Sequence, residues 1–199
     1  MGKLFNGYVS GTNVSERQLL TIKYNNSRLN ILLLVVFTVI NAVLLLVQSG
    51  SYFLFSAYIP YFFIDLGMLM CGKYPEEVYT EYYNGMILFD DSFLVVTCVL
   101  AAIVVGVYLL CWFMSKKKAR WLTTALILIS LDTVMMFLLL GFSLQSIFDY
   151  LFHAYLIYSL ASGVSANKKL RALPPEEAIV EVADFEELPA DEDAPQIEE

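Results

Sequence analysis

The chain has 199 residues, of which 58% are hydrophobic and only 16% are charged. Soluble domains average about 45–50% apolar and about 25% charged residues, so this composition indicates a membrane protein. The net charge of −8 belongs to one end of the chain: residues 1–171 carry twelve bases and nine acids, a net of +3, whereas residues 172–199 carry eleven acids and no base. An acidic balance argues against nucleic acid as a partner. At this length we expect one domain followed by a tail.

The chain opens with a polar segment, residues 1–28, which we place in the cytoplasm because it carries four bases. Within it, Ser15 followed three residues later by Gln18 has the form of a capping box and predicts a short helix lying on the membrane. The first membrane span is predicted at about 29–48. Its apolar run contains one amide side chain, Asn41, near the middle.

Residues 49–91 are the predicted outer loop, which would fold into a helical cap on the membrane surface. Within it, residues 52–70 are apolar enough to suggest a further span, but Pro60 would interrupt a helix there. We expect this segment to lie in the outer interface, with Tyr58 and Tyr61 among its aromatic anchors at headgroup level. A re-entrant loop is the rarer alternative, because its backbone would need hydrogen-bond partners inside the protein.

Three further spans are predicted at about 92–114, 121–141 and 145–164, and each is about the length needed to cross ~30 Å of hydrocarbon. Trp112 and Trp121 flank the loop between the first two of these spans, as interfacial anchors do. Lysine and arginine are concentrated beside the predicted cytoplasmic ends of the spans: Lys116, Lys117, Lys118, Arg120, Lys168, Lys169 and Arg171.

The fold class is therefore an all-α, four-helix transmembrane bundle. Eleven of the twelve bases lie on one side of the membrane in this topology, and only Lys73 lies on the other. By the positive-inside rule both termini are cytoplasmic, and we expect the chain in the plasma membrane.

Ionisable residues in the last two predicted spans are the main candidates for a functional site. The turn between these spans falls near residue 142 or 143, ten to eleven residues after Asp132 and ten to eleven before His153. Both side chains should therefore lie ~15 Å from the turn, close to the bilayer centre. Asp149 lies one helical turn before His153 on the same face, and Asn41 of the first span is at similar depth.

Two readings of this polar cluster differ in function. Ionisable side chains inside a membrane are functional candidates by default, so the cluster could conduct a proton or cation. Alternatively, Asp132, Asp149, His153 and Asn41 form a hydrogen-bonded clasp between helices, which we favour. No ligand spacing supports a metal site. Ser159 and Gly163, small residues four apart, would allow close helix approach.

The last segment, residues 165–199, combines a basic stub with an acidic tail that contains four prolines and is expected to be disordered. No catalytic motif is visible, and no cofactor is predicted. We expect a non-enzymatic assembly, accessory or scaffold protein. Its expected partners are the lipid bilayer, further copies of the same chain, and a cytoplasmic protein recruited by the acidic tail. The alternative is an oligomeric transporter coupled to protons or ions through the Asp/His cluster.

Overall fold

The structure, a computed structural model, describes residues 15–53, 55–81, 83, 85–141 and 147–174. This part of the chain is helical and contains no strand. The helices in order are α1 (Glu16–Leu46), α2 (Tyr58–Met70), α3 (Glu76–Glu81), α4 (Asp91–Ser115), α5 (Arg120–Leu140) and α6 (Ile147–Ala172). Residues 175–199 of the predicted disordered tail and the turn at 142–143 lie outside the described residues.

Three of the described helices, α1, α4 and α5, are long and apolar enough to cross a membrane. The all-helical class and these three spans agree with the sequence. The fourth predicted span corresponds to α6, which is 26 residues long. Its ionisable, tyrosine and serine side chains lower its hydropathy, and it is not among the helices with a sufficiently apolar stretch.

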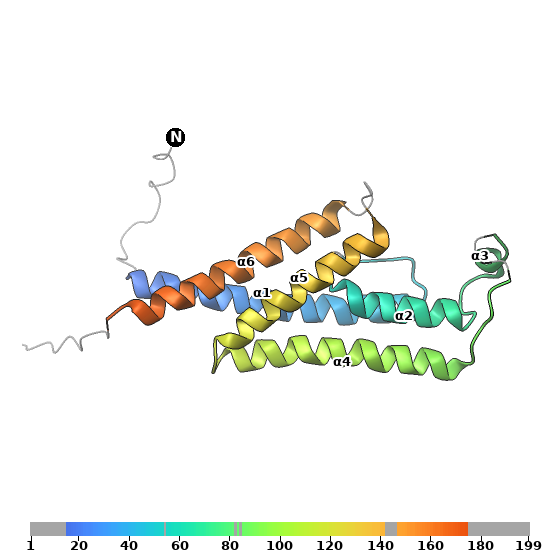
Figure 1. The fold of residues 1–199 in the computed structure, drawn as a ribbon, viewed down its shortest axis with the longest axis horizontal. Helices are drawn as coiled ribbons and strands as arrows, with labels where there is room; N and C mark the ends of the chain where they lie inside the picture. Colours follow the sequence, from blue (N-terminus) through green and yellow to red (C-terminus); the bar gives the residue numbers. More distant parts are fainter. Residues whose placement is uncertain (1–14, 54, 82, 84, 142–146, 175–199) are drawn as a thin grey trace, which may run out of the picture.

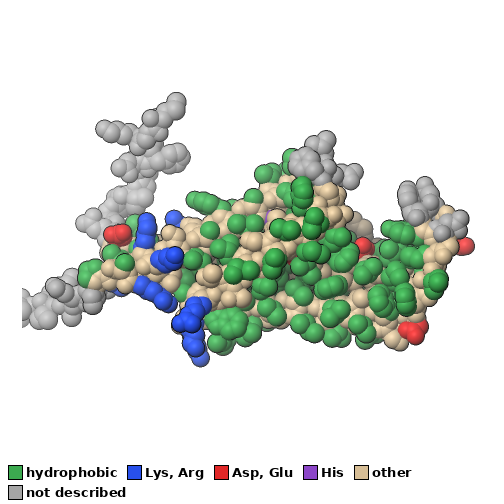
Figure 2. Space-filling view, in the orientation of Figure 1, with side chains coloured by type: hydrophobic (Ala, Val, Ile, Leu, Met, Phe, Trp, Pro, Cys, Tyr) green, Lys and Arg blue, Asp and Glu red, His purple; other side chains and the backbone are tan. Residues whose placement is uncertain are grey.

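The long helices lie side by side in an elongated bundle, with α2 beside α4 and α3 beyond one end (Figure 1). The start of α1, the end of α6 and the α4–α5 turn meet at the opposite end. Lysine and arginine side chains gather at that end, and hydrophobic side chains cover the visible flank between the two ends (Figure 2). This distribution is the one expected when the flank contacts lipid and the ends contact water.

The capping box predicted at the start of the chain is present. The Ser15 side chain accepts from the backbone N–H of Gln18, and the Gln18 side chain accepts from the backbone N–H of Ser15. The helix that follows is not a separate surface helix, however. It continues without a break into the first span and forms the 31 residues of α1, because no proline or glycine interrupts the sequence between the box and the apolar run.

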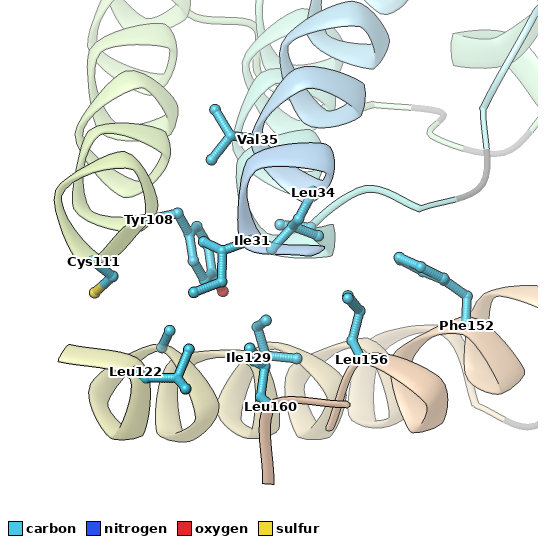
Figure 3. Close-up of a cluster of buried hydrophobic side chains, with 12 residues drawn as sticks. Ile31, Leu34, Val35, Tyr108, Cys111, Leu122, Ile129, Phe152, Leu156 and Leu160 are labelled. Carbon is cyan, nitrogen blue, oxygen red and sulfur yellow. The ribbon is translucent and has the colours of Figure 1, made fainter. Parts of the chain in front are cut away.

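Apolar side chains from α1, α4, α5 and α6 form the main core (Figure 3). Fully buried members include Ile31, Leu34, Cys111, Leu122, Leu156 and Leu160. The α1–α6 contact is close where Gly163 faces Ser27: a Cβ added to Gly163 would lie 2.5 Å from the Ser27 Cβ. The Ser27 hydroxyl donates to the Ser159 carbonyl at 2.7 Å. The predicted small pair, Ser159 and Gly163, thus lies at a helix contact.

The C-terminal end of α4 is held by side chains of α1. The Tyr24 hydroxyl donates to the Ser115 carbonyl at 2.6 Å, and Arg28 donates to the Ser115 hydroxyl at 2.8 Å. The last carbonyls of a helix lack partners within the helix and carry partial negative charge, so a guanidinium there is favourable. Trp112 and Trp121, the predicted interfacial anchors, are half-buried on either side of the α4–α5 turn.

Candidate functional site: a buried aspartate–histidine pair at the start of a short helix

The candidate site is built around Asp132, in the middle of α5, and His153, in the first half of α6. The Nε2 atom of His153 lies 3.0 Å from Oδ2 of Asp132. The accessible fraction is 1% for Asp132 and 2% for His153. The two residues that the sequence places at equal distances from the α5–α6 turn are therefore in direct contact inside the bundle.

Asp132 also binds the beginning of α2. Its Oδ2 accepts from the backbone N–H of Tyr58 at 2.9 Å, and its Oδ1 accepts from that of Ile59 at 2.8 Å. The first N–H groups of a helix lack partners within the helix and attract negative charge. A carboxylate from α5 thus supplies the cap that the residue before α2, Ala57, cannot supply with its own side chain.

The other N–H groups at the start of α2, which have no acceptor within the helix, are also paired or absent. The backbone N–H of Ala57 donates to the Thr38 hydroxyl oxygen at 2.9 Å, and that hydroxyl donates to the Leu34 carbonyl. The next position, Pro60, has no N–H. Every donor of this first turn is therefore paired with a side chain of α1 or α5, or is absent.

Asn41 of α1 holds the non-helical segment before α2. Its amide nitrogen donates to the Phe53 carbonyl at 2.6 Å and to the Ser56 hydroxyl at 2.8 Å, and its carbonyl oxygen accepts from the Phe53 N–H at 2.8 Å. Asn41 is 1% accessible. It therefore lies in the buried polar region, as expected, but it binds the segment that leads into α2 and not the aspartate–histidine pair.

The position of α2 corrects the expected surface cap. Residues 52–70 do not lie across the outer end of the bundle, because the start of α2 reaches Asp132 in the middle of α5. Tyr58 is buried, with 9% of its surface accessible, so it is not a surface anchor, and Tyr61 is half-buried. Pro60 does not interrupt the helix, because it occupies the first turn, where the missing N–H costs nothing.

The hydrogen bonds of His153 define where its protons lie. Its Nδ1 is 2.8 Å from the backbone carbonyl oxygen of Asp149. A carbonyl only accepts, so Nδ1 carries a proton. Nε2 then either donates a second proton to the Asp132 carboxylate or accepts one from the carboxylic acid. In both cases one proton lies between Nε2 and Oδ2, and the pair as a whole is neutral.

Asp149 hydrogen-bonds to His153 through its backbone carbonyl, and its carboxyl group makes no hydrogen bond in the described part of the chain. It lies in the first turn of α6, half-buried, one helical turn before His153. Thr97 and Cys98 of α4 lie against α2 and are not part of the cluster. The structure therefore brings together two of the four candidate side chains, those of Asp132 and His153. Asn41 holds the segment before α2, and Asp149 contributes its backbone carbonyl to His153.

The arrangement offers few groups for metal binding, ligand binding or proton transfer to water. No group of three His, Cys, Asp or Glu side chains suited to a metal ion occurs among the described residues. No buried side-chain nitrogen or oxygen lacks a partner there. Since Asp132 and His153 are almost fully buried, they do not line a water-filled path in this conformation.

Sequence reasoning missed the partners that α2 provides. They are backbone N–H groups about 70 residues from Asp132 in the chain, and backbone donors leave no mark in residue types. One signal was available: proline is tolerated in the first turn of a helix, so Pro60 is compatible with a helix that begins just before it.

No family model, curated protein or solved structure matches the chain. The geometry of the bundle is therefore the basis on which its function can be proposed.

Proposed function

We propose that the chain is a multi-pass membrane protein with a non-enzymatic assembly or accessory role, and that the Asp132–His153 pair is a structural lock. The observation that carries this proposal is that each polar side-chain atom of the pair has a hydrogen-bond partner within the protein, at 1–2% accessibility. A group that binds a transported ion or a substrate needs a position left open for it.

The proposed membrane topology has four spans and one half-helix. At 13 residues, α2 is ~20 Å long and too short to cross ~30 Å of hydrocarbon. Its beginning bonds to the middle of α5, and its end leads toward α3 at the end of the bundle. We therefore treat residues 47–70 as a re-entrant segment, whose irregular backbone is tolerated because Thr38, Asn41 and Asp132 satisfy it.

The fourth proposed span is α6. It packs along α1 and α5, and its histidine faces Asp132 and not the lipid. Polar residues that would be costly in lipid are acceptable where they face a neighbouring helix. With four spans, the eleven bases near the span ends fall on one side, and both termini are cytoplasmic. The acidic residues 172–199 would then recruit a basic cytoplasmic protein.

The test is ion flux together with stability. Wild-type protein in liposomes should conduct no more protons or sodium ions than empty liposomes. Asp132→Asn and His153→Ala should lower the melting temperature of the detergent-purified protein, and Asp149→Asn, a matched control with the same chemical change, should lower it much less. Wild-type flux that disappears in folded Asp132→Asn and His153→Ala would contradict the lock.

The assembly role has a separate test. The full chain and a version ending at Arg171 would be purified from the native membrane with mild detergent. We expect a partner protein that is retained by the full chain and lost with the tail. A full chain that purifies alone under crosslinking conditions would count against recruitment.

A transporter remains the second candidate because of one observation. In several transporters, the positive end of a half-helix points at a charged group near the middle of the membrane, and α2 points at Asp132 in this way. Such a role requires a second conformation in which α2 moves away from Asp132, and ion flux in liposomes distinguishes the two functions.

A further inference from the structure

A polar groove runs between α1 and α6, away from the Asp132–His153 pair. Its volume is about 330 Å³. Its polar lining comes from Lys23, Asn26, Asn30, Tyr155, Ser159 and Ser162, and its apolar lining includes Leu29 and Leu33. The groove exists because Gly163 and Ser27 let the two helices approach closely, while the small serines of α6 leave space beside that contact.

We propose that this groove binds the headgroup of an anionic phospholipid, with the acyl chains lying along α1.

The charge of the groove supports an anionic ligand. Lys23 lines it, and no carboxylate does, among the described residues. Arg28, the next base of α1, is directed away and binds the end of α4. Lys23 is thus the base available to a ligand here, and an ammonium group suits a phosphate as a point charge.

The hydrogen-bonding groups of the groove include several without a partner. The side chains of Lys23, Asn26 and Ser162 make no hydrogen bond or ion pair within the described part of the chain. By contrast, the Asn30 amide donates to the Ser159 hydroxyl at 2.6 Å, which fixes the floor of the groove. Two unpaired polar groups and one cation around a fixed floor match a phosphate and its glycerol.

The position of the groove favours a lipid over a free phosphate. The apolar run of α1 begins at Ile31, and Asn26 and Lys23 precede it by five and eight residues. At the helical rise these residues lie ~7.5 and ~12 Å from its start, which places Asn26 in the headgroup region of a bilayer and Lys23 at its outer edge. Leu29 and Leu33 continue the groove toward the membrane interior and are about half exposed, at 52% and 48%.

The test compares lipids with identical acyl chains. Native mass spectrometry of the full chain in detergent would measure the binding of phosphatidylglycerol and phosphatidylcholine. We expect the anionic lipid to bind about tenfold more tightly. Lys23→Gln should remove most of this preference, whereas Lys117→Gln, which removes the same charge from the α4–α5 turn, should retain it. An equal loss in both variants would show diffuse charge attraction and overturn the site.

A second variant tests the space and not the charge. Ser162→Phe fills the groove without changing its charge and should weaken the binding of both lipids, with melting curves confirming that the variant folds. Unchanged binding would place the lipid elsewhere. Inorganic phosphate should not displace the lipid at equal concentration, and displacement would reduce the site to a phosphate site. A dimer that Ser162→Phe dissociates, with lipid binding unchanged, would assign the groove to a second copy of the chain.

Discussion

Oδ2 of Asp132 lies 3.0 Å from Nε2 of His153 and 2.9 Å from the backbone nitrogen of Tyr58. One carboxylate oxygen thus joins α5 to α6 and to the first turn of α2. The second oxygen binds the next residue of α2, so the carboxyl group makes three hydrogen bonds to two other elements. The packing of α2, α5 and α6 against one another therefore depends on the Asp132 side chain.

Asp132→Ala should cause a larger loss of stability than substitutions at Asn41, Gly67 or Asp90. It would leave two backbone N–H groups of α2 and the Nε2 atom of His153 without partners in a dry interior. Removing one partner of a buried pair costs about 3–5 kcal/mol of unfolding free energy. Unfolding in a detergent of graded denaturing strength, followed by circular dichroism, measures the loss.

The control for this prediction is Asp149→Ala, since His153 uses only the Asp149 backbone carbonyl. Its effect should be less than half that of Asp132→Ala. If the two variants are equally unstable, the Asp149 carboxyl has a role in the junction that the hydrogen bonds do not account for.

Asn41→Leu should release the segment that leads into α2. The substitution keeps the volume approximately but leaves the N–H and C=O of Phe53 unpaired. Each unpaired buried group costs about 1–3 kcal/mol. Hydrogen exchange should increase at residues 51–57 and at the start of α2 before it increases in α4. Asn26→Leu, on the exposed face of the same helix, should leave exchange there unchanged.

Gly67→Ala should separate α2 from α4. An added Cβ would collide with the Thr97 hydroxyl and lie 3.0 Å from a methyl carbon of Leu94. Forcing an extra carbon into such a contact costs about 1–3 kcal/mol. The melting temperature should fall, and Thr97→Ala should restore part of it in the double variant.

Gly106→Ala is the matched control, because a Cβ there meets nothing within 4 Å. Alanine also favours the helix over glycine. A fall in melting temperature for Gly106→Ala comparable to that for Gly67→Ala would mean that the loss does not come from the α2–α4 contact.

The start of α4 should contribute a pH-dependent stability. Asp90 caps this helix by accepting from the Ser92 N–H at 2.9 Å, and the hydrogen bonds from Ser92 lower the pKa of its carboxyl. A lowered folded-state pKa stabilises the protein above the usual value of about 4, and this contribution is lost as the pH falls through the folded-state pKa. Asp90→Ala should therefore melt below wild type at pH 7, with the difference shrinking below about pH 4.

Asp90→Ser separates the charge from the cap. Serine still accepts from the Ser92 N–H but does not titrate. This variant should melt near wild type at pH 7, and its stability should lack the Asp90 contribution to the acid response. An Asp90→Ala deficit that is constant down to pH 3 would contradict the ionised cap.

The contact between Asp132 and His153 could be predicted from the sequence because it depends on local geometry. Two helices joined by a short turn bring residues at equal distances from the turn to the same depth, and the helical rise is constant. Asn41 is placed near mid-span by its position within the first apolar run. The capping box at Ser15 was also readable, since it depends on two residues three apart.

The position of α2 could not be predicted in this way. Hydropathy measures how apolar residues 52–70 are, and a surface helix and a buried half-helix give the same value. The choice depends on whether the backbone near Ala57 finds partners, and these come from Thr38 and Asp132, on two separate helices. Such pairing is a property of the assembled bundle, so a periodic pattern within one segment does not contain it.

The capping of α2 by a residue of α5 has a consequence for the order of synthesis. Thr38 and Asn41 emerge from the ribosome before α2 and can hold the segment before it at once. Asp132 emerges more than 70 residues after Tyr58. Until then, the first N–H groups of α2 have no acceptor inside the protein and must stay near water. The start of α2 therefore reaches its final position only after α5 has been synthesised, so the second helix of the chain is among the last to be fixed in place.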